Sequence, residues 1–162
     1  MSIRAEEPPV REWRRDGYVL SNDPARVDVE TVHRFLSEQS YWAKGIPREV
    51  VERSIAGSLV FGIYEEATGE QVGFARVITD QATFAYLADV FVLQTARGKG
   101  LSTWMVGLIL QQPQMQGLRR TLLATADAHT LYSRFGFRPL EKPERWMERH
   151  VPDVYERLSP RS

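Results

Sequence analysis

The sequence predicts an α+β fold, in which a mixed and mostly antiparallel central sheet is flanked by helices. Three observations carry this prediction. Two apolar runs at residues 59–64 and 72–78 flank a turn at residues 67–70, which indicates a β-hairpin. Residues 84–93 are apolar almost throughout, as expected of a central strand that is covered on both faces. Residues 97–103 then hold two glycines between this strand and an apolar helical pattern.

The remaining elements follow from periodicity and from capping residues. Asp28 is a suitable N-cap for a helix whose apolar residues recur at positions 29, 32, 35 and 36. Pro47 suits the first position of a second helix, which Gly57 ends. In chain order, the prediction is a strand at 18–20, these two helices, strands at 59–64, 72–78 and 84–93, a helix at 100–111, a strand at 121–125, a helix at 128–135 and a strand at 137–140.

Length and composition favour one domain. The chain has 162 residues, of which 43% are hydrophobic, and this is enough to bury a core without a metal or a disulfide. Residues 1–17 are charged and lack periodicity, so we expect a loosely ordered leader there. A single domain is expected over residues 18–150, followed by a C-terminal tail over residues 151–162.

Charge and cysteine content exclude several classes of partner and chemistry. The 21 basic and 21 acidic residues balance, so no overall field would hold nucleic acid or an anionic membrane. The absence of cysteine excludes disulfides and thiol nucleophiles, and no spacing of His, Asp and Glu suggests a metal site. No apolar window approaches the roughly 20 residues of a membrane span. We therefore expect a cytoplasmic protein that binds neither nucleic acid nor membrane.

The junction between residues 84–93 and the following helix has the composition of an anion site. Gly98 and Gly100 allow the backbone to approach a ligand closely, and the amides at the helix start point to the same place. Arg97 and Lys99 add positive charge, and two hydroxyl residues follow. A phosphate or pyrophosphate is therefore the expected guest.

Other phosphate loops fit this junction less well. A Walker A loop has lysine and a hydroxyl residue directly after its second glycine, whereas Lys99 lies between the two glycines. A dinucleotide-binding loop needs a third glycine where the chain has Thr103, and it needs a βαβ unit near the start of the chain. The junction alone also leaves open a glycine-rich turn with solvated basic side chains.

Two motifs together give a resemblance to a known family. Arg97-Gly98-Lys99-Gly100-Leu101-Ser102 is similar to Gln/Arg-x-x-Gly-x-Gly/Ala, and Ala128-His129-Thr130-Leu131-Tyr132-Ser133-Arg134-Phe135-Gly136-Phe137 is similar to Ala-x-x-Leu-Tyr-x-x-x-Gly-Phe. Both are motifs of the GNAT superfamily of acetyl-CoA-dependent N-acetyltransferases, and they occur in its order and spacing. The resemblance covers residues 59–140.

The resemblance implies a GNAT-like sheet that splays open between its fourth and fifth strands, with acetyl-CoA as co-substrate in the opening. Backbone groups of Phe91, Val92 and Leu93 would pair with the pantetheine arm like a missing strand. A bulge in that strand would free an N–H to polarise the thioester oxygen. The other implied coenzyme-binding residues are Arg97, Gly98, Lys99, Gly100, Leu101, Ser102, Thr103 and Thr125, and Thr125 stands where many members have asparagine.

Acetyl transfer to an amine needs a neutral nucleophile and a protonated leaving thiolate. Asp89 is the candidate base, because burial in its apolar strand would raise its pKa; the alternative is a carboxylate satisfied by the backbone or by a nearby Arg or Tyr. The resemblance places Tyr132 at the coenzyme sulfur as general acid, and the alternative is core packing against Phe135 and Phe137. His129 ranks below Asp89 as a base.

The acceptor amine is expected opposite the coenzyme. Exposed aromatic residues on a loop between two helices would form a lid over a small amine or a peptide end. The candidate substrate-binding residues are Tyr41, Trp42, Arg76 and Tyr86. Packing of Trp42 into the core is an equal alternative.

The sequence therefore favours an N-acetyltransferase that acts on a primary amine of a small molecule or a protein by direct attack in a ternary complex. A non-catalytic acyl-CoA-binding sensor on the same fold is the alternative. Such a sensor would need the loop at residues 97–102 but neither Asp89 nor Tyr132, and both are present. The resemblance also leaves a homodimer open, since dimers are common in the family.

Overall fold

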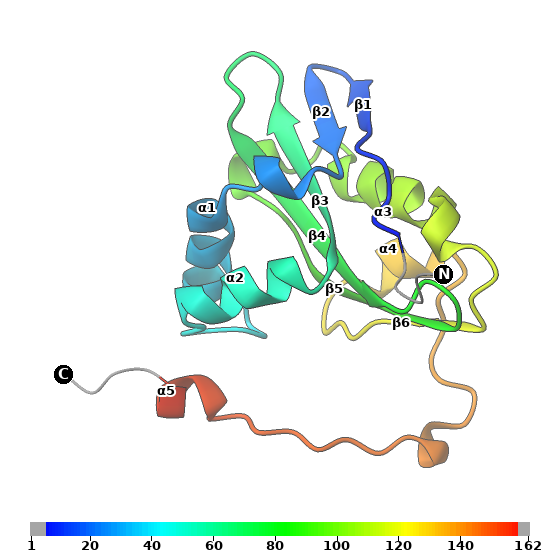
Figure 1. Cartoon of the computed structure of the whole chain (residues 1–162). Coiled ribbons are helices and arrows are strands. Elements are labelled where there is room, and N and C mark those ends of the chain that lie inside the picture. Colours follow the sequence, from blue (N-terminus) through cyan, green and yellow to red (C-terminus); the bar gives the residue numbers. More distant parts are fainter. Residues whose placement is uncertain (1–5, 159–162) are drawn as a thin grey trace. The chain divides into compact units, whose positions relative to one another are not determined.

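A computed structural model of the chain describes residues 6–158. Its strands, in chain order, are β1 (Glu12–Arg15), β2 (Tyr18–Ser21), β3 (Leu59–Glu65), β4 (Gln71–Thr79), β5 (Phe84–Val92) and β6 (Arg120–Leu122). Within the described residues they form one six-stranded sheet in this same order, antiparallel between neighbours except for the parallel pair β5–β6. The predicted mixed and mostly antiparallel sheet is confirmed (Figure 1).

The chain forms two compact units, residues 1–124 and residues 125–162. The first holds the sheet and three α-helices, α1 (Val29–Arg34), α2 (Arg48–Ala56) and α3 (Leu101–Gln111). It also holds a π-helix at Phe35–Gln39 and 3-10 turns at Pro24–Arg26, Gln94–Ala96 and Pro113–Met115. Helices α1 and α2 lie on one side of strands β3–β5 and α3 lies on the other (Figure 1). The second unit holds α4 (His129–Ser133), a 3-10 turn at Pro143–Arg145 and α5 (Val154–Leu158).

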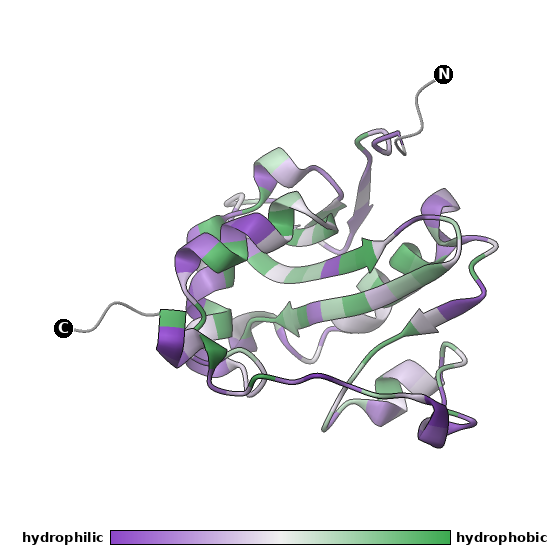
Figure 2. Ribbon diagram, turned by 60° about the horizontal axis from the view of Figure 1, so that its bottom comes forward, coloured by the Kyte–Doolittle hydropathy of each residue, from purple (hydrophilic) through white to green (hydrophobic). Residues whose placement is uncertain are grey.

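The core of the first unit forms where the sheet meets α3. Helix α3 packs on β3, β4 and β5, and Figure 2 shows hydrophobic residues along these central strands. Ile63 of β3, and Met105 and Ile109 of α3, are completely buried. Each large apolar side chain removed from water contributes about 1.5–3 kcal/mol to stability. This packing fixes the position of α3 relative to β5, and so the position of the loop that joins them.

Capping residues set the starts of the first two helices. The Asp28 carboxylate accepts a hydrogen bond from the Thr31 amide at 3.3 Å, which confirms the predicted N-cap of α1. Pro47 is the N-cap of α2, with extended backbone, and not its first helical residue as predicted. Gly57 ends α2, as the sequence predicts.

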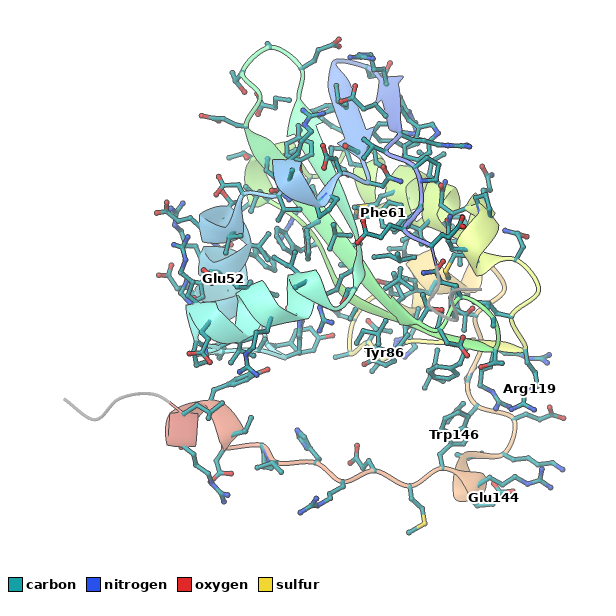
Figure 3. All side chains as sticks on the ribbon, in the orientation of Figure 1. Glu52, Phe61, Tyr86, Arg119, Glu144 and Trp146 are labelled. Carbon is teal, nitrogen blue, oxygen red and sulfur yellow. The ribbon has the colours of Figure 1, made fainter. Side chains whose placement is uncertain are left out.

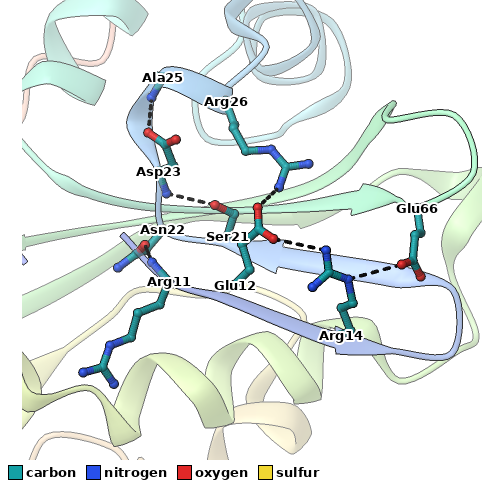
Figure 4. Close-up of polar contacts among 9 residues, drawn as sticks. All are labelled: Arg11, Glu12, Arg14, Ser21, Asn22, Asp23, Ala25, Arg26 and Glu66. Atoms are coloured by element: carbon teal, nitrogen blue, oxygen red, sulfur yellow. Dashed lines mark hydrogen bonds and ion pairs between the residues drawn. The ribbon is translucent and has the colours of Figure 1, made fainter. Parts of the chain in front are cut away.

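Strand β1 lies within the stretch that the sequence predicts to be loosely ordered. It pairs with β2 along its whole length, and charged side chains reinforce this hairpin (Figure 4). Glu12 forms ion pairs with Arg26 at 2.7 Å and with Arg14 at 3.3 Å, and Arg14 also contacts Glu66 at 3.2 Å. Such charges on a short edge strand discourage pairing with other chains.

The predicted loose order of residues 1–17 therefore does not hold for residues 12–15, because backbone pairing and long-range ion pairs order them. Residues 1–5 of the predicted leader and residues 159–162 of the predicted tail lie outside the described residues. The described part of that tail contains α5. The domain bounds at residues 18 and 150 stay a prediction.

The two last predicted strands differ from the structure. Residues 137–140 do not form a strand, since Pro139 lacks an N–H and the Phe137 ring packs against Tyr132 instead. Strand β6 is shorter than predicted, because its register with β5 runs only from Phe84↔Arg120 to Tyr86↔Leu122. Beyond Tyr86, β5 continues to Val92 without a strand partner on this side among the described residues.

We expect Gly62→Ala to lower the free energy of unfolding by about 1–3 kcal/mol through overpacking. A Cβ at this position of β3 would lie 2.5 Å from the Tyr64 hydroxyl oxygen and 2.8 Å from its ring, and Tyr64 is buried. Chemical denaturation measures the loss. Gly57→Ala is the matched control, since its new Cβ would meet only the Arg53 carbonyl oxygen at 3.5 Å, and an equal loss there would contradict the argument.

Candidate functional site

The loop between β5 and α3 has the backbone geometry of an anion site. Gly98 and Gly100 adopt left-handed φ values of 79° and 71°, which favour glycine, and Gly100 is the N-cap of α3. The first helical hydrogen bond runs from the Trp104 amide to the Gly100 carbonyl at 3.0 Å. The amides of residues 101–103 therefore precede the first helical donor and have no helical acceptor, and no side chain caps them. These donors can bind a phosphate.

Two basic side chains of this loop are held by neighbouring strands. Arg97 Nε donates to the Val92 carbonyl at 2.9 Å and so ties the loop to the end of β5. Lys99 Nζ donates to the Tyr18 hydroxyl of β2 at 2.9 Å and lies 5.4 Å from the centre of its ring. This hydrogen bond raises the pKa of Lys99 above its ordinary value, which keeps the ammonium charged. Positive charge is therefore fixed beside the amides of α3.

Strand β5 contains a β-bulge at Asp89. Phe74 of β4 is opposite Phe91 and Arg76 is opposite Ala88, so one residue of β4 faces two of β5. Asp89 has a left-handed φ of 53°. Aspartate tolerates this conformation better than most residues. The bulge that the resemblance implies is therefore present in the structure, directly before Phe91, Val92 and Leu93.

The Asp89 carboxylate has a specific partner at each oxygen. Oδ2 accepts a hydrogen bond from Arg76 Nε at 2.6 Å, and Oδ1 accepts one from the Trp42 indole at 2.8 Å. Arg76 also donates to the Ser58 hydroxyl at 3.2 Å. The side chains of Asp89 and Arg76 are only 8% and 18% exposed, respectively. Of the two alternatives for Asp89, this geometry matches the carboxylate satisfied by a nearby arginine.

Three of the four predicted acceptor-side residues lie near this carboxylate or near each other. Trp42 contacts Asp89 and Tyr41, with the two aromatic rings perpendicular and 5.0 Å apart. Their exposed fractions are 53% for Tyr41 and 42% for Trp42, so Trp42 is not a core residue. Arg76 contacts Asp89.

Tyr86 lies three residues before Asp89 on β5 (labelled in Figure 3). It is half-buried and in register with Ile78 of β4 and Leu122 of β6, at the last residue pair before β5 and β6 separate. Tyr86 therefore marks the position on the sheet where the opening begins.

Sequence reasoning missed three residues that organise the site. Phe35 stacks on Phe91 with ring centres 4.0 Å apart, Ser58 contacts Arg76, and Tyr18 holds Lys99. Phe35 belongs to a regular apolar helical stripe, which predicts burial but not the strand residue that it meets. The contacts of Ser58 and Tyr18 join residues far apart in the chain and leave no local signal.

The second motif lies in the second unit. Tyr132 is buried in α4, and its ring meets Phe137 edge-on at 5.9 Å, as in the packing alternative. The Thr125 hydroxyl accepts a hydrogen bond from the Ala128 amide at 3.0 Å, directly before α4 begins. His129 is the first residue of α4, and it is exposed. Thr125 therefore lies at the start of the helix that contains Tyr132, and Gly136, with a left-handed φ of 86°, follows the end of that helix.

Along residues 6–158, no group of three or more His, Cys, Asp and Glu side chains could hold a metal ion. None of the helices in this range is both long and apolar enough to cross a membrane.

The chain is similar to known proteins in sequence and in fold. A family model described as the acetyltransferase (GNAT) domain matches residues 56–139. A candidate acetyltransferase of Gibberella zeae is 32% identical over an alignment of 142 residues, covering 75% of this chain and 79% of that protein. A solved candidate acetyltransferase of the GNAT family from Xanthomonas campestris pv. campestris is 49% identical, with a TM-score of 0.82 and coverage of 85% of this chain and 96% of that one.

A more distant structure contains the coenzyme. A candidate acetyltransferase from Clostridium acetobutylicum, solved with acetyl-CoA, is 16% identical, with a TM-score of 0.59 over 82% of this chain and 94% of that one. At this identity the likeness shows a shared fold.

Removing the Arg76 side chain should destabilise the protein through Asp89. Arg76→Met leaves a nearly buried carboxylate without its counter-ion, and we expect the free energy of unfolding to fall by about 1.5–3 kcal/mol, the usual range for a hydrogen bond to a charged group. Arg48→Met is the matched control, because the Arg48–Glu52 pair is 54% and 53% exposed and should contribute at most about 1 kcal/mol. Denaturant titration compares the two variants. Equal losses of unfolding free energy would show that the Arg76–Asp89 pair stabilises the protein no more than an exposed ion pair does.

Proposed function

Because the chain belongs to the GNAT acetyltransferase family, we propose that it moves an acetyl group from acetyl-CoA to a primary amine of a small molecule or of a peptide. The observation that carries this proposal is the junction of the bulged strand β5 with the glycine loop of α3. A strand edge that pairs with no strand among residues 6–158 and a cluster of helix-start amides lie within a single stretch of chain, residues 87–103. An extended thiol-bearing arm that ends in a pyrophosphate has complementary chemistry at both places.

The coenzyme would be held mainly by backbone groups. The amides of Leu101, Ser102 and Thr103 supply the pyrophosphate donors, and the Arg97 and Lys99 charges lie beside them. Phe91, Val92 and Leu93 form the strand segment along which the pantetheine arm would pair. Within this segment the Leu93 amide already donates to the Val72 carbonyl at 2.7 Å, and the Val92 carbonyl accepts from Arg97 Nε at 2.9 Å. The acetyl-CoA complex of the Clostridium acetobutylicum protein, which shares the fold, supports this choice of coenzyme. Gly98, Gly100 and Thr125 complete the proposed set, the glycines through their backbone conformation.

The bulge would activate the thioester for attack by the amine. The extra residue at Asp89 interrupts the regular pairing between β4 and β5, so a backbone N–H there need not be used by the ladder. Directed at the thioester oxygen, this donor would stabilise the negative charge that develops as the amine attacks. Such stabilisation requires no side chain, which suits a strand of apolar residues.

Acetyl transfer proceeds by direct attack in a ternary complex. The neutral amine forms a bond to the thioester carbon, the C–S bond breaks, and the thiolate takes a proton from the Tyr132 hydroxyl, which then takes a proton from solvent. The proton released by the new amide passes to water or to a carboxylate. Both oxygens of Asp89 accept hydrogen bonds, so proton uptake there requires the contact with Arg76 or with Trp42 to open. A water relay needs no such rearrangement.

The first experiment is calorimetric titration with acetyl-CoA, followed by thiol-release assays with a panel of small amines and peptides. Binding with turnover of one amine class supports the proposal, whereas binding without turnover supports a non-catalytic acyl-CoA sensor. We expect Gly100→Asp to weaken acetyl-CoA binding at least about 100-fold, because it places a carboxylate at the proposed pyrophosphate site.

Gly69→Asp is the matched control for this variant. Gly69 has a similar left-handed φ of 75° and open space around its would-be Cβ, but it lies in the turn between β3 and β4. It introduces the same charge and the same backbone strain away from the loop. Equal loss of binding in both variants would refute the proposed pyrophosphate site.

Tyr132→Phe should lower turnover and leave acetyl-CoA affinity almost intact. A positioned general acid typically contributes about 10²–10⁴-fold to the rate, and the ring, which packs against Phe137, remains in the variant. Thiol-release kinetics with the best amine of the panel, combined with calorimetry, separates kcat from binding. Unchanged turnover would remove Tyr132 from the chemistry.

A further inference from the structure

The connection between α1 and α2 is an ordered loop with exposed aromatic residues. We name residues 40–46 the acceptor loop. Ser40 is buried; its hydroxyl donates to the Leu36 carbonyl at 2.6 Å and accepts from the Ala43 amide at 3.1 Å. At the other end of the loop, the Ile46 carbonyl contacts His33 Nε2 at 2.9 Å. These contacts order the loop backbone, while Tyr41 and Trp42 present their rings to solvent.

A π-helix places the start of the acceptor loop against β5. The Ser40 amide donates to the Phe35 carbonyl at 3.0 Å, which closes a wider turn than that of an α-helix. Phe35 then stacks nearly parallel on Phe91, at 4.0 Å and 12°. Phe91 is the residue at which pairing with β4 resumes after the bulge. This stacking is an apolar attachment of the loop to one side of the bulge.

Trp42 provides a polar attachment at the bulge itself. Its indole N–H donates to Asp89, whose other oxygen is held by Arg76 of β4. The Asp89 backbone is in the left-handed region, which costs of order 1 kcal/mol for a residue other than glycine. The two side-chain bonds favour this conformation, because they fix where the carboxylate lies. The same carboxylate thus holds both the bulge and the acceptor loop.

We propose that Asp89 is a positioning residue, which fixes the Tyr41–Trp42 aromatic pair over the bulged strand so that the acceptor amine meets the thioester in a fixed geometry. This inference rests on the proposed function for its effect on the acceptor, but the tether itself is a property of the fold. Asp89 acts through Trp42 and through the bulge and does not take the amine proton. The exposed faces of the two rings are the surface that the acceptor contacts.

The charge balance around Asp89 supports this role. Arg76 Nε lies 2.6 Å from the carboxylate, and the Arg76 side chain is itself mostly buried, so the pair is shielded from solvent. Protonating Asp89 would leave the Arg76 guanidinium without its counter-ion in that environment, which is costly.

The test compares Asp89→Ala, Asp89→Asn and Trp42→Phe by amide hydrogen exchange and by steady-state kinetics. Trp42→Phe keeps an aromatic ring and removes the N–H donor. Asp89→Asn keeps an oxygen that can accept from Trp42, and asparagine also tolerates left-handed backbone. Glu52→Gln, in the exposed Arg48–Glu52 pair of α2, is the matched control for a lost ion pair.

For Asp89→Ala and Trp42→Phe, we expect exchange of the amides in the acceptor loop to accelerate and the amine KM to rise, each about tenfold or more, as for one lost hydrogen bond to a charged group. The acetyl-CoA KM should change less than the amine KM. In Asp89→Asn, we expect both the exchange rate and the amine KM to return a substantial part of the way to their wild-type values. The kcat of this variant should keep the same dependence on pH as that of the wild type.

Two results would overturn the inference. Unchanged exchange of the acceptor loop in Asp89→Ala would show that no tether exists. Loss of the acid limb of the pH–kcat profile in Asp89→Asn, with kcat as low as in Asp89→Ala, would identify Asp89 as the proton acceptor. The exchange measurement needs no turnover, so it decides the tether even if no amine proves to be a substrate and the proposed function fails.

Discussion

Strand β5 has one residue more than β4 can pair, and both sides of the candidate site depend on this mismatch. A single residue of β4 faces Asp89 and Val90 together, and Asp89 takes the left-handed backbone that this requires. Pairing resumes at Phe91, so the sheet continues while its hydrogen-bond ladder is interrupted at one place. The interruption redirects the Asp89 carboxylate, and in the proposed function it also provides a backbone donor.

On the proposed coenzyme side, the separation of β5 from β6 follows from how short β6 is. Parallel pairing ends at Tyr86, and the remaining residues of β5 run on to the glycine loop. Packing of α3 on β3–β5 then holds the helix-start amides at the end of that strand edge. Backbone groups therefore supply most of the proposed binding chemistry. The side chains of Arg97 and Lys99 contribute charge, and each is itself held by a neighbouring strand.

On the acceptor side, a loop far away in the chain is fastened to the same strand at two points. The stacked rings of Phe35 and Phe91 are buried beside the bulge, and the Trp42–Asp89 hydrogen bond orients the exposed ring. In a loop held only where it joins its helices, the aromatic side chains could adopt several rotamers. Attachments at both Asp89 and Phe91 remove much of that freedom before any substrate binds, which lowers the entropic cost of binding.

Local pattern alone determined the hairpin of β3 and β4, the apolar strand β5, the N-cap at Asp28 and the glycine loop, because each depends on residues close together in the chain. Tertiary structure decided the rest. The bulge depends on the register between two strands, and the partners of Asp89 lie 13 and 47 residues away. The order of β1 depends on β2 and on distant charges, and residues 137–140 form no strand although their pattern allows one. A side chain's chemistry is set by its neighbours in space, and spacing along the chain specifies these only within a turn or a hairpin.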